Sequence, residues 1–170
     1  MTSSNADRML EAAAERREAL AVPGMGPQPE KKVAVLACMD TRLDVLLLLG
    51  IERGDAHTIR NAGGLVTDDA LRSLAISQRL LETEEIVVLM HDGCGLLGGS
   101  DEDFARKLEA DGAGSDWKLG AFADVEEELA SGLARLRSTP ALIHRDRIRG
   151  FVFDPETGTL REVAPASGGA

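Results

Sequence analysis

The chain has 170 residues, which fits a single domain, and 44% of them are hydrophobic, so a sizeable core is expected. Its formal net charge of −10 argues against nucleic acids and anionic membrane surfaces as partners. An apolar signal core and a bilayer-spanning run are both absent from the sequence, which predicts a cytoplasmic location with no membrane association.

The N-terminal segment is predicted to be a helical arm. Residues 4–20 are rich in Ala, Glu, Arg and Leu, which favour helix, and Asn5 is a suitable N-cap. Their apolar stripe is thin, which is typical of an arm that packs on a partner subunit or stays unordered. Prolines and glycines at 23–29 then predict a linker. We therefore expect an arm and linker over 1–30, a main domain over 31–164 and a loose tail over 165–170.

Within the main domain, predicted strands alternate with predicted helices. This alternation is typical of an α/β fold with parallel strands, in which sites lie beyond the carboxyl ends of the strands. The last strand follows a turn and is expected to pair back as a hairpin. In chain order, the elements are a strand at 33–37, a helix at 43–49, a strand at 56–60, a helix at 68–81, a strand at 86–90, helices at 101–110 and 125–136, and strands at 151–153 and 160–163.

Three sulfur and nitrogen ligands follow two of these strands. Cys38 ends the first strand, and His91 and Cys94 follow the third; the chain has no other cysteine. Zinc accepts thiolate and imidazole, and three protein ligands leave a fourth position open, as in catalytic sites. The pattern therefore predicts a zinc site, which makes 31–164 a zinc-binding catalytic domain. Two alternatives remain open, namely two buried structural cysteines beside a satisfied histidine, or a Cys–His nucleophile pair.

Asp40 and Arg42 form a second constellation beside Cys38. If the chain stays extended as far as Arg42, all three side chains face the same side. Arg42 would then keep Asp40 ionised and oriented, and the carboxylate would accept a hydrogen bond from a zinc-bound water. The alternative is an ion pair on the solvated surface.

Other polar residues are weaker candidates. We expect His57 to be structural or exposed and His144 to lie on the surface. Residues 61–64 form either a loop that approaches a ligand or merely a turn. Asp92 either supports the neighbouring ligand or is solvated, and the acidic run at 126–128 is expected to be a solvated helix face.

These motifs together resemble those of the β-class carbonic anhydrases, most closely the short actinobacterial-type members. The resemblance covers roughly residues 31–163, and the pairing of the two main motifs is specific. The segments that carry it are Cys38-x-Asp40-x-Arg42, His91-x-x-Cys94, Ile59–Gly63 and Thr67–Ser73.

The resemblance implies a mostly parallel four-stranded sheet, extended by an antiparallel strand and flanked by helices. It implies an enzyme that converts carbon dioxide and water to bicarbonate and a proton, and an obligate homodimer that in some members forms a tetramer. It also implies zinc on Cys38, His91 and Cys94, with Asp40 and Arg42 as the catalytic dyad.

In some members of that family, the equivalent aspartate swings onto the metal in a closed, inactive state. This sequence departs from the family at Asp92, where relatives often carry Thr or Ser, so an extra negative charge is expected near the site. Hydrolysis of carbonyl sulfide or carbon disulfide on the same scaffold is an alternative function. A non-catalytic zinc or redox-sensing protein is another, although a sensor would not need the Asp40–Arg42 pair.

Overall fold

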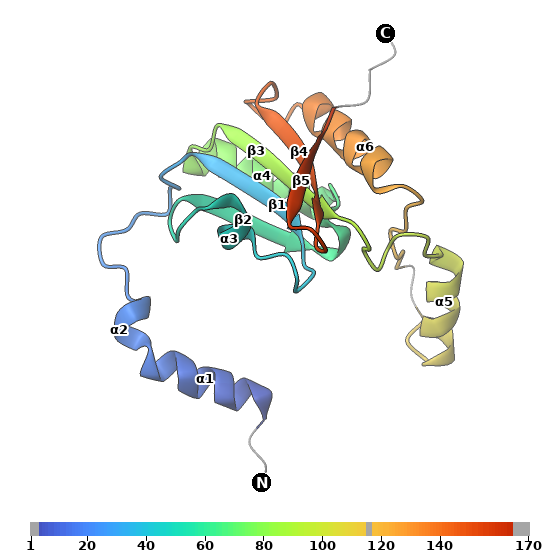
Figure 1. The fold of residues 1–170 in the computed structure, drawn as a ribbon, viewed down its shortest axis with the longest axis horizontal. Helices are drawn as coiled ribbons and strands as arrows, with labels where there is room; N and C mark the ends of the chain where they lie inside the picture. Colours follow the sequence, from blue (N-terminus) through green and yellow to red (C-terminus); the bar gives the residue numbers. More distant parts are fainter. Residues whose placement is uncertain (1–3, 115–116, 165–170) are drawn as a thin grey trace.

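A five-stranded sheet forms the centre of the molecule (Figure 1). The computed structural model describes residues 4–114 and 117–164; the predicted tail at 165–170 lies outside this part. The strand order is β2-β1-β3-β4-β5, with the first four strands parallel and β5 antiparallel to β4. This confirms the predicted fold class. The strands are β1 (Val33–Cys38), β2 (Ala56–Asn61), β3 (Glu85–His91), β4 (Ile148–Asp154) and β5 (Thr159–Val163).

Helices flank the sheet, and most begin at a side-chain cap. Thr67 accepts a hydrogen bond from the Ala70 amide, and Asp124 accepts from the first turn of its helix, so each satisfies amides that the helix itself leaves free. The helix after β1 starts two residues later than predicted, because Asp44 is its N-cap. The helices are α3 (Val45–Leu49), α4 (Asp68–Leu81), α5 (Asp101–Ala110) and α6 (Val125–Ser138), with a short 3-10 turn η1 (Ala62–Gly64).

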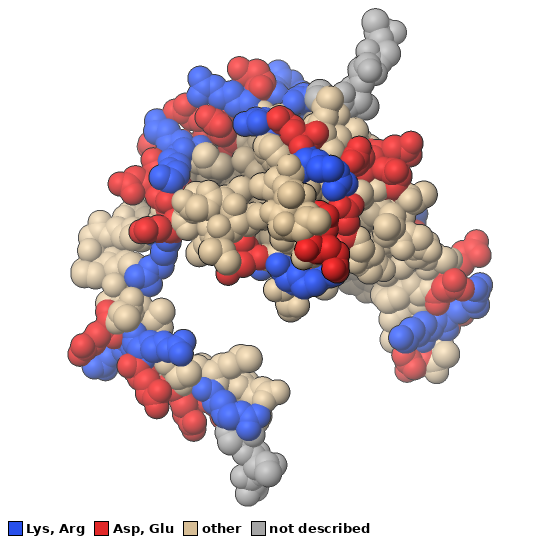
Figure 2. Space-filling view, in the orientation of Figure 1, with Lys and Arg blue, Asp and Glu red and all other residues tan. Residues whose placement is uncertain are grey.

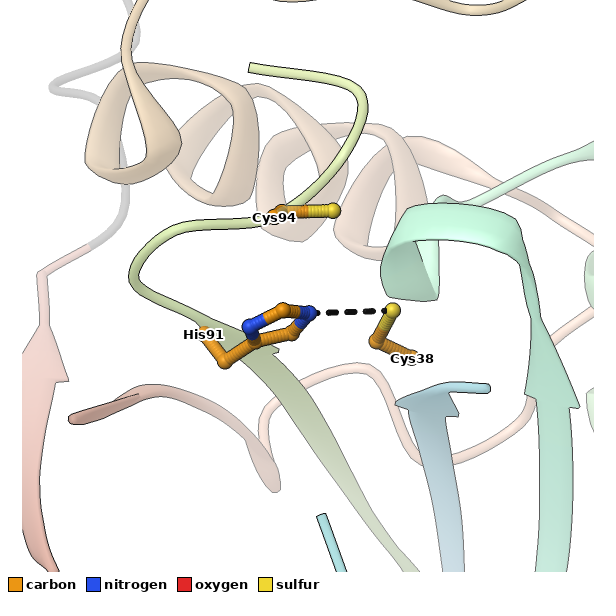
Figure 3. A group of neighbouring side chains, drawn as sticks. All are labelled: Cys38, His91 and Cys94. Carbon is orange, nitrogen blue, oxygen red and sulfur yellow. Dashed lines mark hydrogen bonds between the residues drawn. The ribbon is translucent and has the colours of Figure 1, made fainter. Parts of the chain in front are cut away.

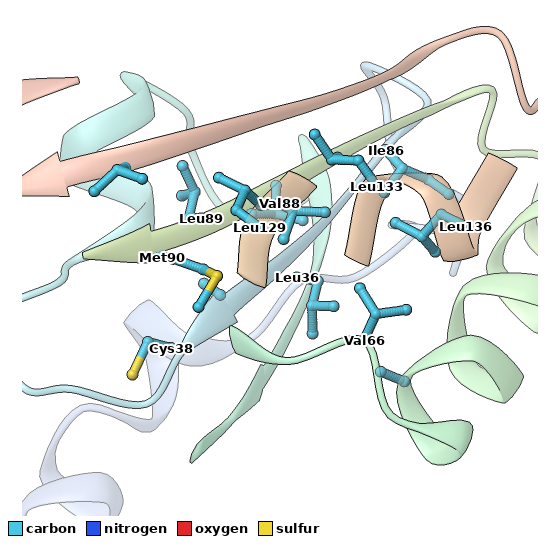
Figure 4. Close-up of a cluster of buried hydrophobic side chains, with 14 of the residues drawn as sticks. Leu36, Cys38, Val66, Ile86, Val88, Leu89, Met90, Leu129, Leu133 and Leu136 are labelled. Atoms are coloured by element: carbon cyan, nitrogen blue, oxygen red, sulfur yellow. The ribbon is translucent and has the colours of Figure 1, made fainter. Parts of the chain in front are cut away.

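Much of the core lies between the central strands and α6, and the core is almost entirely aliphatic (Figure 4). Residues 34–38 of β1 are all buried, as expected for a strand covered on both faces. Gly150 of β4 allows close packing of α6, because a Cβ there would lie 2.8 Å from Leu133 Cδ1 and 2.9 Å from Leu129 Cδ1. β4 begins at Ile148, three residues earlier than predicted. The prediction missed this start because Arg149 and Gly150 interrupt the apolar pattern of the strand.

The N-terminal arm differs from the predicted single helix. It forms α1 (Asn5–Glu15) and α2 (Arg17–Leu20), separated at Arg16, whose backbone has φ −96° and ψ 9°. Ser4 rather than Asn5 is the N-cap. No residue of α1 or α2 is buried, and both helices extend away from the sheet (Figure 1).

The surface carries acidic and basic side chains intermixed on the face shown in Figure 2. Several of them pair, such as Arg149 with Glu162 across the β4–β5 hairpin. Among the described residues, the helices are all too short or too polar to cross a membrane.

Candidate metal centre

Cys38, His91 and Cys94 converge at the carboxyl edge of the sheet (Figure 3). Their strands, β1 and β3, are parallel neighbours, so both end at the same edge. One sulfur or nitrogen atom from each side chain lies within 4.8 Å of the others, and all three residues are buried. The structure therefore brings together the three residues that the sequence singled out as zinc ligands.

The geometry of these donors fits a single zinc ion. The Nδ1–H of His91 donates to the Asp92 carbonyl at 2.9 Å, and this leaves the Nε2 lone pair facing Cys38 Sγ at 3.3 Å. Tetrahedral zinc, at about 2.0–2.3 Å from each donor, places the donors roughly 3.5–3.8 Å apart. Burial raises the pKa of the Cys94 thiol, and the nearby Cys38 raises it further. A bound cation would compensate both effects by stabilising the thiolates.

Asp40 and Arg42 are paired at the rim of this centre. Arg42 Nε donates to Asp40 Oδ1 and Arg42 Nη2 to Oδ2, both at 2.9 Å. The Arg42 backbone amide also donates to Oδ1 at 2.9 Å. These hydrogen bonds hold the pKa of the Asp40 carboxyl well below its usual range. Asp40 Oδ2 lies 3.6 Å from His91 Nε2, so the pair borders the donor group and is not a remote surface ion pair.

The backbone conformation behind this pairing differs from the extended one on which the prediction depended. The chain does not stay extended as far as Arg42: β1 ends at Cys38 and a turn follows. The Asp40 side chain accepts the amide two residues ahead, and its carbonyl accepts from the Leu43 amide at 3.1 Å. Aspartate favours such a turn over extended backbone, because its side chain accepts a hydrogen bond from a nearby backbone amide. The chain folds back at this turn, and this brings the Asp40 and Arg42 side chains together.

Arg60, for which the sequence indicated no role, supports the end of β1. Arg60 Nε and Nη2 donate to the Cys38 carbonyl at 3.0 and 2.9 Å, and Nη2 also donates to the Asp40 carbonyl at 2.7 Å. The guanidinium thus satisfies backbone carbonyls on both sides of Met39. The sequence offered two signals, namely an arginine near the end of a short strand and its place in the Ile59–Gly63 segment that resembles the family.

The glycine turn after β2 packs directly against the centre. Gly64 has φ +70°, and a Cβ there would lie 2.7 Å from the Leu89 carbonyl oxygen and 2.9 Å from the Cys38 amide nitrogen. A cleft of about 230 Å³ opens beside the ligands, bordered by Asp40 and by the apolar side chains of Met39, Ala62 and Leu96. The turn is therefore part of the wall of the site.

The remaining candidates lie outside the donor group. His57 is structural, because its ring bonds the Ser77 hydroxyl at 2.8 Å and the Pro27 carbonyl at 2.9 Å. His144 is half-buried and is not part of the donor group. The Asp92 carboxylate forms an ion pair with Arg161, which compensates the extra negative charge expected there.

Known proteins are similar to most of this chain in sequence and in fold. Residues 33–117 match the family model for carbonic anhydrase. Beta-carbonic anhydrase 1 of Mycobacterium tuberculosis is 49% identical over 138 residues, covering 81% of this chain and 85% of that protein. Carbon disulfide hydrolase of Acidithiobacillus thiooxidans is 36% identical over 158 residues, covering 81% and 79%. The crystal structure of carbonic anhydrase from Streptococcus mutans has a TM-score of 0.88 at 38% identity, covering 96% of this chain and all of that one.

Proposed function

This chain belongs to the β-class carbonic anhydrases, and from that premise we propose that it uses one zinc ion, held by Cys38, His91 and Cys94, to hydrate carbon dioxide reversibly to bicarbonate and a proton. One observation carries the proposal. Three buried soft donors and an ionised carboxylate, itself held by an arginine, meet at the rim of one small cleft. A structural zinc site would not require the Asp40–Arg42 pair.

The metal ligands, Asp40 and Arg42 have different roles in the proposed reaction. Bound zinc would act as a Lewis acid that lowers the pKa of a water toward ~7, so that hydroxide is available near neutrality. Asp40 accepts a hydrogen bond from this attacking water and so turns an oxygen lone pair toward the cleft. Its low pKa keeps Asp40 ionised, and therefore an acceptor, at neutral pH. Arg42 holds the carboxylate in this orientation through two parallel hydrogen bonds.

The cleft provides a place for the substrate. Its walls include the Met39, Ala62 and Leu96 side chains, which suit an apolar molecule such as carbon dioxide. Hydration adds the water oxygen to the substrate carbon and releases one proton to solvent. Bicarbonate is charged and leaves the apolar wall more readily than the substrate does.

Carbon disulfide hydrolysis is the second candidate activity. It is favoured by the similarity to the Acidithiobacillus enzyme over most of the chain. Carbon disulfide is also a linear apolar molecule, and the same activated water would attack its carbon. The donors and the dyad serve both reactions equally, so substrate preference depends on the cleft.

A homodimer is proposed as the working form. Met9 and Leu10 on α1 are 71% and 69% exposed, and Ser4 and Asp7 form a capping box at the start of this helix. A helical arm that projects from the sheet with exposed apolar side chains is suited to packing on a second copy of this chain.

Metal analysis combined with two activity assays tests the proposed function. Protein purified without added metal should contain about one zinc per chain, and carbon dioxide hydration should exceed carbon disulfide hydrolysis. His91→Ala should lose the zinc, whereas His57→Ala, which removes a structural histidine, should retain it. Substoichiometric zinc together with a Cys38–Cys94 disulfide would contradict the proposal. Faster hydrolysis of carbon disulfide would favour the second candidate.

A further inference from the structure

We propose that Arg161 on β5 is a positioning residue for His91, acting through Asp92, and that it sets the affinity of the centre for zinc. The proposal rests on the proposed function, because it concerns zinc bound by His91. It assigns a role to Asp92, at which this sequence departs from the family, and to Arg161, its ion-pair partner.

Asp92 connects the arginine to the metal ligand. Arg161 Nη1 donates to Asp92 Oδ2 at 2.6 Å, and Nη2 donates to Oδ1 at 3.1 Å. The carbonyl of the same Asp92 accepts the His91 Nδ1–H at 2.9 Å. The backbone amide of Asp92 donates to the Phe153 carbonyl of β4 at 2.9 Å. All the hydrogen-bonding groups of Asp92 are therefore engaged, and one of them orients the imidazole.

The turn that carries this carbonyl is held from two sides. Gly93 follows Asp92 with φ +64°, a backbone conformation that L side chains rarely adopt, and no atom lies within 4 Å of the place where its Cβ would be. Arg42 Nη2 donates to the Gly93 carbonyl at 3.2 Å on one side, and Arg161 holds Asp92 on the other. Two arginines, from segments far apart in sequence, thus restrain the short turn between His91 and Cys94.

Arg161 is itself held in place. Its Nε donates to Glu126 Oε1 at 3.2 Å, in the first turn of α6. The guanidinium thus ties together α6, β5 and the end of β3. Glu126 therefore has a specific partner and is not simply part of the solvated helix face that was expected for residues 126–128.

The expected effect falls on the metal and not on the fold. The side chains of Arg161 and Asp92 are 42% and 39% exposed, and ion pairs with this exposure contribute little to stability. Partners that orient a ligating histidine, by contrast, change metal affinity by roughly 10–100-fold when removed. A variant at Arg161 should therefore fold but hold zinc more weakly.

The direction of the effect separates positioning from simple charge. If Arg161 acted only through its charge, its removal would leave Asp92 as an unpaired anion near the centre and would strengthen binding of a divalent cation. If it acts by holding the turn, its removal weakens binding. The two interpretations thus predict opposite changes.

The test compares Arg161→Met with Arg149→Met by competition for zinc against a chelator. Arg149 is a matched control, because it lies on the adjacent strand of the same hairpin and makes an equivalent two-pronged pair with Glu162, at 2.8 and 2.7 Å, with no contact to the turn. We expect Arg161→Met to bind zinc roughly tenfold or more weakly and Arg149→Met to match the wild type. Arg161→Lys should lie between them, because it keeps the charge but loses the second hydrogen bond.

Asp92→Asn completes the experiment. It should also weaken zinc binding, and the double variant Asp92→Asn, Arg161→Met should be no weaker than the worse single variant, because both changes break one connection. Unchanged or tighter zinc binding by Arg161→Met would overturn the proposal, as would an equal loss in Arg149→Met. If the wild-type protein itself binds no zinc, the proposed function fails instead, so the two failures are distinguishable.

Discussion

Asp40 and Arg42 face each other across two parallel hydrogen bonds of 2.9 Å, although only one residue separates them in the chain. A third bond, from the Arg42 amide to Asp40 Oδ1, closes the turn between them. The carboxylate is thus oriented before any substrate arrives. A preorganised acceptor of this kind loses little free energy to reorganisation during the reaction.

Asp40→Asn is expected to keep zinc but lose turnover. Cys38, His91 and Cys94 all remain, so the zinc content should stay near one per chain. The amide is neutral and places an NH₂ group where the carboxylate accepted hydrogen bonds, so the attacking water loses its orientation. We expect carbon dioxide hydration to fall by ~10² or more, measured on the same samples as the zinc content.

Asp69→Asn is the matched control for this substitution. Asp69 also accepts from an arginine, Arg72, but on the exposed surface of α4. Its activity should equal that of the wild type. Near-normal turnover in Asp40→Asn would remove Asp40 from the mechanism, and loss of zinc would show that Asp40 is a ligand.

Arg42→Ala is expected to lower turnover by releasing Asp40. Asp40 Oδ2 lies only 3.6 Å from His91 Nε2, so the freed carboxylate is able to rotate onto the metal and exclude water. Rates of hydration should fall, and a crystal structure of the zinc-loaded variant should show Asp40 bound to the metal. A structure with Asp40 in its original orientation, combined with normal rates, would contradict this prediction.

Gly64→Ala is expected to destabilise the protein strongly. The left-handed backbone conformation costs alanine roughly 1–2 kcal/mol, and the clash with the Leu89 carbonyl and Cys38 amide should add about 1–3 kcal/mol. Gly98→Ala isolates the first contribution, because Gly98 has φ +69° and no atom lies within 4 Å of the place that a Cβ would occupy. Urea unfolding of the two variants measures the difference, and equal losses would refute the close approach.

Deletion of residues 1–18 is expected to weaken the dimer and leave the sheet folded. The truncation keeps the Ala19 and Leu20 carbonyls, which accept hydrogen bonds from Arg53. Light scattering should report a dimer for the full chain and a shift toward monomer after deletion. Leu10→Ser should act in the same direction, and Glu11→Ser on the same helix should have no effect. A monomeric full-length chain would disprove the dimer.

The local features of this fold could be predicted from the sequence, because they depend on neighbouring residues. Apolar runs marked the buried strands, and Thr67 and Ser100 marked helix starts through hydrogen bonds within one turn. The donor group could also be anticipated, because parallel strands end at a common edge and both cysteines follow or lie at such ends. The arm was predicted less well, since the break at Arg16 leaves no mark in helix propensity.

Only the tertiary structure decided how the site is supported. Arg60 reaches the Cys38 carbonyl from 22 residues away, and Arg161 reaches Asp92 from 69 residues away. An arginine on a strand has no local partner that would reveal such a role, because its long side chain selects a partner only after the sheet has assembled. The residues that we propose to perform the chemistry were therefore readable from sequence, whereas those that hold them in position depended on the order of the strands.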